Sequence, residues 1–136
     1  MLTMMTMRPL SLPILFLSLA LALPSGCAAS GARTLSTPHR VEEGYASYYA
    51  SQLQGRPTAS GAPYDERRLT AAHRVLPFGT HVRVTNLANG RSTVVTITDR
   101  GPLRRDRLID VSRRAAHTLG FERAGIARVR VKVVSK

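Results

Sequence analysis

Hydrophobic and polar residues alternate along much of the chain after residue 40. The clearest case is the stretch 127–134, where three valines alternate with two arginines and a lysine. A period of two is typical of a strand with one buried and one exposed face. Shorter β-branched or apolar runs predict further strands at 44–51, 69–73, 81–86, 91–98 and 108–112.

Turn and cap residues separate these runs. Asn89-Gly90 predicts a hairpin between the third and fourth of them, because both residues tolerate positive φ, and Pro77-Phe-Gly79 predicts a turn. Ser112 is suited to cap a short helix that ends at Gly120, and residues 52–65 form a predicted loop. Six short strands with one or two short helices indicate a small all-β barrel.

The first 27 residues have the pattern of an export signal. A basic start is followed by a short apolar run and by small residues up to Cys27. An anchor that is never cleaved is the alternative. Ser25, Gly26 and Cys27 resemble the bacterial lipobox, although Pro24 departs from it, so Cys27 is a candidate lipidation site; cleavage after Ala28 or Ala29 is the other outcome. Residues 28–40 are predicted to be a flexible tether.

The chain is strongly basic, with 20 Lys and Arg against 8 Asp and Glu and a net charge of +12. This charge favours a polyanionic partner. Export argues against nucleic acid, and the chain lacks alternating aromatic and basic residues that could stack on single strands. Peptidoglycan, whose stem peptides carry carboxylates, is the polyanion that an exported bacterial domain would meet. The excess of arginine could instead serve only solubility.

Two aspartates are the principal candidates for chemistry. Asp99 and Asp110 each end an apolar or β-branched run, where a strand presents a carboxylate at the rim of a barrel. Asp99 is either a general acid or a turn residue paired to its own loop or to Arg100. Asp110 is either a second groove acid or a strand-end residue ahead of the helix. His73 is either a buried, hydrogen-bonded histidine or a group that tunes a carboxylate.

Other kinds of site are not indicated. The remaining histidines show no ligand spacing with His73, and no cysteine follows Cys27, so neither a zinc site nor another metal site is expected. The loop around Gly61 lacks the lysine and the following helix of a phosphate-binding loop. We expect no cofactor.

Eight short motifs, in order and in spacing, resemble the rare lipoprotein A (RlpA) family. They are GYASYY at 44–49, GRPTASG at 55–61, LTAAH at 69–73, LPFGT at 76–80, VRVTNL at 82–87, NGRS at 89–92, TDRGP at 98–102 and IDVS at 109–112. The resemblance implies that residues 41–136 form a six-stranded double-psi β-barrel, related to expansin and barwin domains.

The resemblance also implies a lytic transglycosylase that cleaves peptidoglycan glycan strands and leaves 1,6-anhydro ends. In this reaction the sugar's own 6-hydroxyl is the nucleophile, so one carboxylate can serve as acid and then as base, whereas ordinary hydrolysis uses two. The family motifs place catalytic weight on Asp99 and His73, and Asp110 matches the aspartate of expansin-type barrels. Candidate substrate-binding residues in the motifs are Thr58, Tyr64, Arg100 and Tyr48.

One family position differs in this chain. Ala62 stands where many members have a glutamate. Asp65 and Glu66 both lie close in sequence, but Asp65 matches a separate family position, so only Glu66 could replace that acid. The alternative function is therefore a non-catalytic, expansin-like barrel that binds peptidoglycan without cutting it. In either case we expect an exported, periplasmic protein, monomeric and anchored through Cys27 to the outer or cell membrane.

Overall fold

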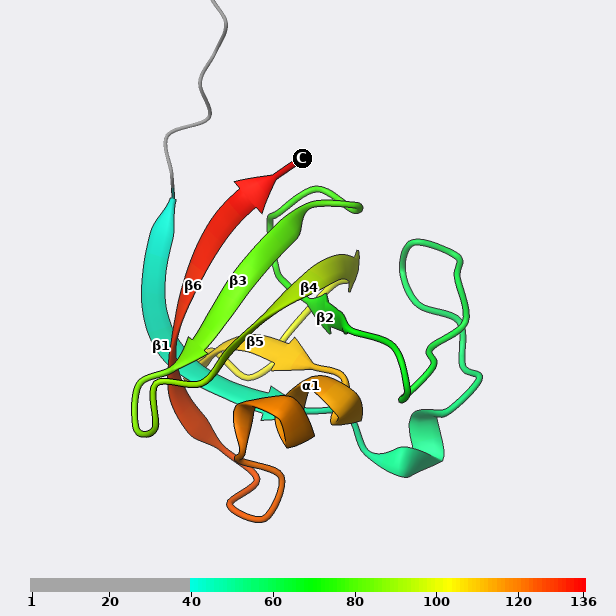
Figure 1. The fold of residues 1–136 in the computed structure, drawn as a ribbon. Helices are drawn as coiled ribbons and strands as arrows, with labels where there is room; N and C mark the ends of the chain where they lie inside the picture. The colour runs from blue at the N-terminus through cyan, green and yellow to red at the C-terminus, as the bar shows by residue number, and fades with distance from the viewer. Residues whose placement is uncertain (1–39) are drawn as a thin grey trace, which may run out of the picture. The chain divides into compact units, whose positions relative to one another are not determined.

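The computed structural model describes residues 40–136, which form six strands, one α-helix and one 3-10 turn (Figure 1). The elements are β1 (Val41–Tyr48), η1 (Ser51–Leu53), β2 (Thr70–Ala72), β3 (His81–Asn86), β4 (Ser92–Asp99), β5 (Arg107–Val111), α1 (Arg113–Leu119) and β6 (Ala127–Ser135). The predictions for Cys27, the signal and all but the last residue of the tether fall outside the described residues.

The strands close into one barrel in the order β1-β5-β2-β4-β3-β6. Two pairs, β1 with β5 and β2 with β4, are parallel, and the other pairs are antiparallel. Figure 1 shows α1 below the barrel, next to the β3–β4 hairpin. The predicted six-stranded β-barrel with short helical elements is confirmed.

The alternating residues supply the barrel core. The inward-facing side chains of β3 and β6 are valines that are at most 2% exposed, at positions 82, 84, 129 and 131. Burying a side chain of this size contributes about 1.5–3 kcal/mol. The intervening residues Arg83, Arg128 and Arg130 are exposed, so the period of two in the sequence corresponds to the two faces of the barrel wall.

The first strand begins three residues before the predicted range and ends at Tyr48. Val41 and Glu43 pair with Lys132 and Arg130 of β6, and the Glu43 carboxylate forms an ion pair of 2.7 Å with the Arg130 guanidinium. Residues 41–43 extend β1 because they pair with residues of β6 that lie almost ninety positions later in the chain. The local sequence does not reveal this pairing. The 3-10 turn at Ser51 prevents the predicted extension to residue 51.

The β3–β4 hairpin is present, but its turn differs from the prediction. Gly90 has a φ of 75°, whereas Asn89 does not have positive φ. The backbone N–H of Asn86 donates to the carbonyl of Arg91, so the four residues 87–90 form the loop between the two strands. The side chain of Asn89 is used elsewhere: its amide donates to the carbonyl of Leu119 at 3.0 Å.

The helix α1 has the predicted ends. The Ser112 hydroxyl accepts a hydrogen bond from the backbone N–H of Ala115 at 3.3 Å, and Gly120 has the left-handed conformation (φ 75°) of a helix end. The buried amide of Asn86 also donates to the carbonyl of Leu119, at 2.9 Å. The hairpin thereby fixes the helix against the barrel.

No helix within residues 40–136 is both long and apolar enough to cross a membrane. In the same part of the chain, no group of three or more His, Cys, Asp or Glu side chains is arranged to hold a metal ion.

Candidate active site

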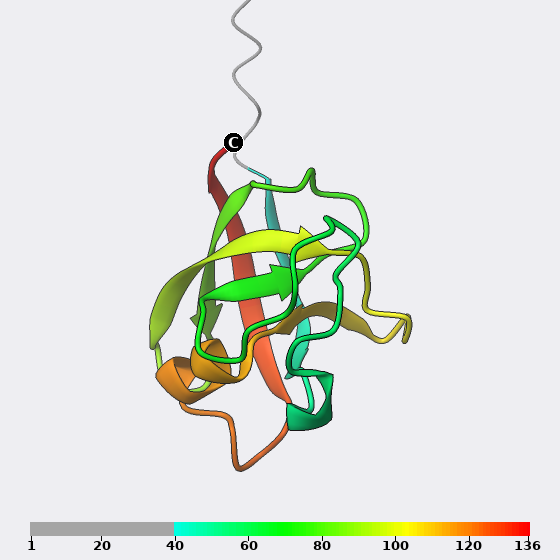
Figure 2. The ribbon, with the colours of Figure 1, turned by 90° about the vertical axis from the view of Figure 1, so that its right-hand side faces the viewer.

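The structure brings Asp99 and Asp110 to neighbouring positions on the barrel wall. Both are in register with Ala72, Asp99 from β4 on one side and Asp110 from β5 on the other. Two strand spacings place their backbones roughly 10 Å apart. Figure 2 shows β4, β2 and β5 side by side, with the segment between β1 and β2 in front of them.

A β-bulge determines the direction of Asp99. The register between β2 and β4 shifts by one residue, so that Asp99 lies opposite Ala72 instead of Thr98. Ala71 belongs to the hydrophobic core, and Ala72, one residue further, therefore faces the outside of the wall. The bulge turns Asp99 to this outer face, beside the segment that contains Ala59.

Three donors hold the Asp99 carboxylate. Its Oδ1 accepts hydrogen bonds from the backbone N–H groups of Ala59 and Arg100, each at 2.8 Å. Its Oδ2 accepts one from the Tyr49 hydroxyl at 2.7 Å. No cationic side chain within residues 40–136 lies in ion-pair distance of Asp99, so the pairing to the Arg100 side chain that the sequence left open is not present. One acceptor position of Oδ2 stays free.

Tyr49 is the side chain that is bonded to Asp99. Burial, the hydrogen bond to Asp99 and the negative charges of Asp99 and Asp110 together raise the pKa of the Tyr49 phenol far above its ordinary value of 10.0. Tyr49 therefore remains a proton donor to Asp99 across the physiological pH range. Its ring also packs against the Tyr64 ring, with centroids 4.7 Å apart.

Asp99 opens into a small cavity of about 150 Å³. The cavity is lined by Tyr49, Leu53, Arg56, Pro57, Thr58, Tyr64 and Asp99. The structure thus brings two predicted substrate-binding residues, Thr58 and Tyr64, together with Asp99. The Thr58 hydroxyl donates to the Ala62 carbonyl at 2.6 Å, and the Tyr64 hydroxyl accepts from the Arg113 backbone N–H at 3.2 Å. Both bonds fix the cavity wall.

Asp110 has a different environment. Its Oδ1 accepts a hydrogen bond from the Ser47 hydroxyl and lies 3.5 Å from a guanidinium nitrogen of Arg107. The same guanidinium donates to Ser47. Asp110 is therefore part of a closed polar network on the outer face, and it does not line the cavity that contains Asp99.

The His73 ring lies apart from the cavity. Its Nδ1 accepts from the backbone N–H groups of Val75 and Leu76, each at 3.2 Å, so Nε2 carries the proton and donates to Glu42 at 3.3 Å. Burial lowers the pKa of His73, and the Glu42 carboxylate only partly opposes this effect. The link to Asp99 is through the backbone, where the His73 N–H donates to the Asp99 carbonyl.

The structure also places Arg100 and Tyr48 away from the cavity. The Arg100 guanidinium donates to the carbonyls of His73 and Leu76 and lies over the Phe78 ring, 4.0 Å from its centroid. Tyr48 points to the other side of β1, where its hydroxyl donates to the Glu122 carbonyl at 2.9 Å. Their predicted substrate roles remain predictions.

The position of Ala62 lies near Asp99. Ala62 is exposed and belongs to the same short loop as Ala59, whose N–H binds Asp99. Neither Asp65 nor Glu66 lines the cavity. Asp65 accepts from the backbone of its own turn, and one carboxylate oxygen of Glu66 is buried without a hydrogen-bond partner. Asp99 is thus the one acid that lines this cavity.

Sequence reasoning missed Tyr49, Ser47 and Arg107. Alternation offered a signal for the first two, since Ser47 within β1 and Tyr49 directly after it alternate with Ala46 and Tyr48. Nothing in the sequence indicated Arg107, because its role depends on the pairing of β1 with β5.

A closed six-stranded barrel with mixed strand directions, and with acids on its outer face at the end of β4 and within β5, defines a double-psi β-barrel of the expansin type. The profile of the family described as "Lytic transglycolase" matches residues 41–131, and the chain belongs to this family.

Named relatives agree with this assignment. A "Probable endolytic peptidoglycan transglycosylase RlpA" of Treponema pallidum (strain Nichols) is 57% identical over 91 residues, which are 67% of this chain and 29% of the relative. A protein of the same name from Synechocystis sp. is 44% identical over 116 residues, 83% of this chain and 36% of the relative. The chain therefore spans about a third of the length of these relatives.

Solved structures are similar in fold. The Streptomyces papain inhibitor has a TM-score of 0.58 and 25% identity, over 71% of this chain and 97% of the inhibitor. An expansin of Clavibacter michiganensis, solved as a mutant with cellohexaose, has a TM-score of 0.56 and 20% identity, over 70% of this chain and 50% of the expansin.

Proposed function

We propose that the chain is a lytic transglycosylase that cleaves the glycan strands of peptidoglycan and leaves 1,6-anhydro ends. The relatives named as endolytic peptidoglycan transglycosylases support this assignment. The observation that carries it is the cavity with a single acid: Asp99 lines it and no other Asp or Glu does. A transglycosylase needs one carboxylate there, whereas ordinary glycoside hydrolysis needs two.

The reaction uses Asp99 twice. In its neutral form, Asp99 gives its proton to the glycosidic oxygen as the bond from that oxygen to C1 breaks. The resulting carboxylate then removes the proton of the 6-hydroxyl on the same sugar as its oxygen bonds to C1. Asp99 is regenerated, no water is consumed, and the products are one chain with a free hydroxyl and one with a 1,6-anhydro end.

The surrounding residues orient this acid. Both acceptor positions of Oδ1 are occupied by backbone N–H groups, whereas Oδ2 has only the Tyr49 bond and keeps one position for the proton that is transferred. The packed rings of Tyr49 and Tyr64, tilted by 34° to one another, line the cavity and offer apolar surface to a sugar ring. Since the His73 side chain is fully bonded elsewhere, its role is to position the strand end that carries Asp99.

The test is product analysis. The purified chain is incubated with glycan strands, and 1,6-anhydro ends are detected by mass spectrometry, with Asp99→Asn as the matched variant. We expect anhydro products from the wild type and their loss in Asp99→Asn. Absence of product from both proteins, or equal product from both, would refute the assignment.

The second candidate function is a non-catalytic barrel that binds peptidoglycan. Ala62 favours it, because the loop that contacts Asp99 has a methyl group where many family members have a glutamate. This function predicts retention on purified sacculi without anhydro products, and gain of product in Ala62→Glu. If Ala62→Glu is no more active than the wild type, Ala62 is not the cause of inactivity.

We also propose that the chain acts outside the cytoplasm as a monomer, held at the outer or cell membrane by a lipid on Cys27. The sequence before residue 28 supports export. Mass spectrometry of the mature N-terminus tests the anchor. A lipid-modified Cys27 is expected, and an unmodified residue after Ala28 or Ala29 would contradict it.

A further inference from the structure

A short hairpin between η1 and β2, residues 55–64, forms one wall of the cavity that contains Asp99. The backbone N–H of Tyr64 donates to the carbonyl of Arg56 at 2.7 Å, and that of Thr58 donates to the carbonyl of Ala62 at 2.9 Å. These bonds pair the two arms of the hairpin. The side chains on the arms therefore start from a fixed backbone beside the cavity.

The tip of the hairpin is bound to the strand that carries the acid. The backbone N–H of Ala59 donates to Asp99 Oδ1 at 2.8 Å, and that of Ser60 donates to the Thr98 carbonyl at 3.1 Å. One hairpin thus holds the acid at its tip and places Arg56 in the cavity wall on its first arm. A ligand of the cavity meets both groups.

Arg56 carries the single positive charge among the residues that line the cavity. The residue is exposed, and within residues 40–136 its guanidinium neither donates a hydrogen bond nor lies in ion-pair distance of a carboxylate. A guanidinium group binds a carboxylate through two parallel hydrogen bonds. The cavity therefore offers a free carboxylate-binding group beside its acid.

Ala62 explains why Arg56 is free. Alternation along the two paired arms puts Arg56, Thr58, Ala62 and Tyr64 on one face of the hairpin. Arg56 lies opposite Tyr64 and diagonal to Ala62, a separation that long side chains can bridge. A glutamate at position 62, which many family members have, would therefore be within reach of Arg56. The methyl group of Ala62 removes this internal partner.

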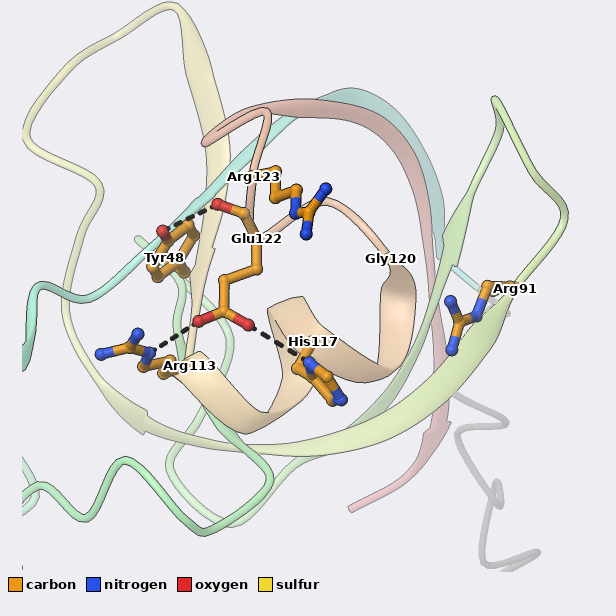
Figure 3. Close-up of a pocket in the computed structure, with 7 residues that line it drawn as sticks. All are labelled: Tyr48, Arg91, Arg113, His117, Gly120, Glu122 and Arg123. Carbon is orange, nitrogen blue, oxygen red and sulfur yellow. Dashed lines mark hydrogen bonds and ion pairs between the residues drawn. The ribbon is translucent and has the colours of Figure 1, made fainter.

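The cations of the two other arginine-rich depressions are already bonded. In the depression of about 630 Å³ beside α1, Figure 3 shows Glu122 between Arg113 and His117. The Arg113 Nε donates to Glu122 Oε1 at 2.8 Å, and the His117 Nδ1 lies 3.2 Å from Oε2. Beside the loop that follows β4, the guanidinium groups of Arg74 and Arg100 donate to backbone carbonyls.

A glycan strand of peptidoglycan carries a carboxylate next to the reacting atom. The sugar whose C1 reacts has a lactyl ether at C3, which ends in a carboxylate where the stem peptide is absent and in a neutral amide where it is attached. The cavity of about 150 Å³ is smaller than the roughly 300 Å³ at which small-molecule pockets begin, so it takes one sugar. Asp99 is neutral when it gives its proton and does not repel this carboxylate.

We propose that Arg56, left free by Ala62, binds the lactyl carboxylate of the sugar on which Asp99 acts, and that Arg56 thereby determines which sugars of the strand react. This inference rests on the proposed function, because it assumes that a glycan strand occupies the cavity. A sugar with an amidated lactyl group has no charge for the guanidinium and binds more weakly.

Binding measured without turnover tests the inference. Every protein carries Asp99→Asn, which removes the acid and resembles its neutral form. A soluble, peptide-free tetrasaccharide of the glycan is titrated in parallel with the same tetrasaccharide whose lactyl carboxylates have been converted to primary amides. Arg56→Gln is compared with Arg83→Gln, which removes the same charge from an exposed position on β3. Arg56→Lys keeps the charge without the two parallel bonds, and Ala62→Glu supplies a competing carboxylate.

We expect Asp99→Asn alone to bind the acidic tetrasaccharide roughly fivefold more tightly than the amidated one, since an exposed charge pair contributes up to about 1 kcal/mol. The difference should vanish with Arg56→Gln and Ala62→Glu, shrink with Arg56→Lys and persist with Arg83→Gln. Equal binding of the two ligands by Asp99→Asn, or an equal loss with Arg83→Gln, would overturn the inference. An unchanged difference with Ala62→Glu would overturn the role of Ala62.

A product assay with Asp99 intact separates this inference from the proposed function. Anhydro products that form equally fast from acidic and amidated strands would support the activity and refute the role of Arg56. Discrimination in binding without products would refute the activity and support the role of Arg56. If both hold, the wild type should cut acidic strands faster than amidated strands, and Arg56→Gln should lose this preference.

Discussion

The Tyr49 hydroxyl is the side-chain group whose removal most directly tests the arrangement around Asp99. Tyr49→Phe deletes the single donor to Asp99 Oδ2 and keeps the ring that packs on Tyr64. Asp99 would still accept two backbone hydrogen bonds at Oδ1. The carboxylate should therefore stay near the cavity but lose its fixed orientation.

The size of the effect follows from the bond that is lost. A hydrogen bond to a charged group contributes about 1.5–3 kcal/mol. Asp99 is partly exposed, so water can replace the phenol, and the lower end of that range applies. A loss of about 1.4 kcal/mol corresponds to a rate roughly tenfold lower. Because Tyr49 acts through Asp99, kcat should fall and KM should change little.

The assay is the rate of formation of anhydro ends, with Tyr64→Phe as the matched control. Tyr64→Phe also removes one phenolic hydroxyl beside the cavity, but that hydroxyl accepts from the Arg113 backbone and does not contact Asp99. A second readout does not need turnover: in thermal unfolding, Tyr49→Phe and Asp99→Ala should be coupled by about 1 kcal/mol. A Tyr49→Phe rate within twofold of wild type, a Tyr64→Phe loss as large, or no coupling would refute the reasoning.

Three further predictions concern stability. Burial lowers the pKa of His73 from 6.5, so the neutral side chain contributes fully to the stability of the fold above about pH 6.5, and this contribution declines as the pH falls towards the folded pKa. His73→Gln should therefore reduce the dependence of the unfolding midpoint on pH in this acidic range. An unchanged dependence would contradict the prediction. Gly44→Ala should lower the unfolding midpoint, because the new Cβ would lie 2.8 Å from the Leu108 Cβ and β5 would have to move. An unchanged midpoint would show that β5 can shift without loss of stability. Asn86→Ala should cost about 0.5–1.5 kcal/mol by chemical denaturation, because it removes one of the two amide donors to the buried Leu119 carbonyl. A cost below about 0.5 kcal/mol would mean that the Asn89 amide alone is sufficient.

Local sequence accounts for most of the fold. The alternation at 127–134 and at 81–86 predicted β6 and β3, since a period of two matches only an extended chain with one buried face. Ser112 and Gly120 predicted the helix ends because capping depends on neighbouring residues alone. The first strand and the hairpin turn were less accurate. Val41 is held by its partner on β6, and Asn89 by the end of α1, and both partners are distant in sequence.

The candidate site was predicted in part. Asp99, Thr58 and Tyr64 were identified from motifs and do share one cavity. The prediction chose Tyr48, whereas its neighbour Tyr49 is the residue that contacts Asp99. The motif contains both tyrosines, and they differ only in the side of the strand to which they point. The catalytic prediction for His73 stays untested, although its ring nitrogens are all bonded outside the cavity.

The sequence by itself determined the barrel strands, the excess of arginine and the two aspartates at strand ends, because each depends on residues close together in the chain. Only the tertiary structure decided which face Asp99 takes. Simple alternation after Ile97 would turn Asp99 into the core, and the bulge opposite Ala72 turns it outward instead. The same holds for the contact between Arg107 and Ser47, which exists because β1 and β5 are paired in parallel. Strand pairing over long distances, not local preference, assembled the site.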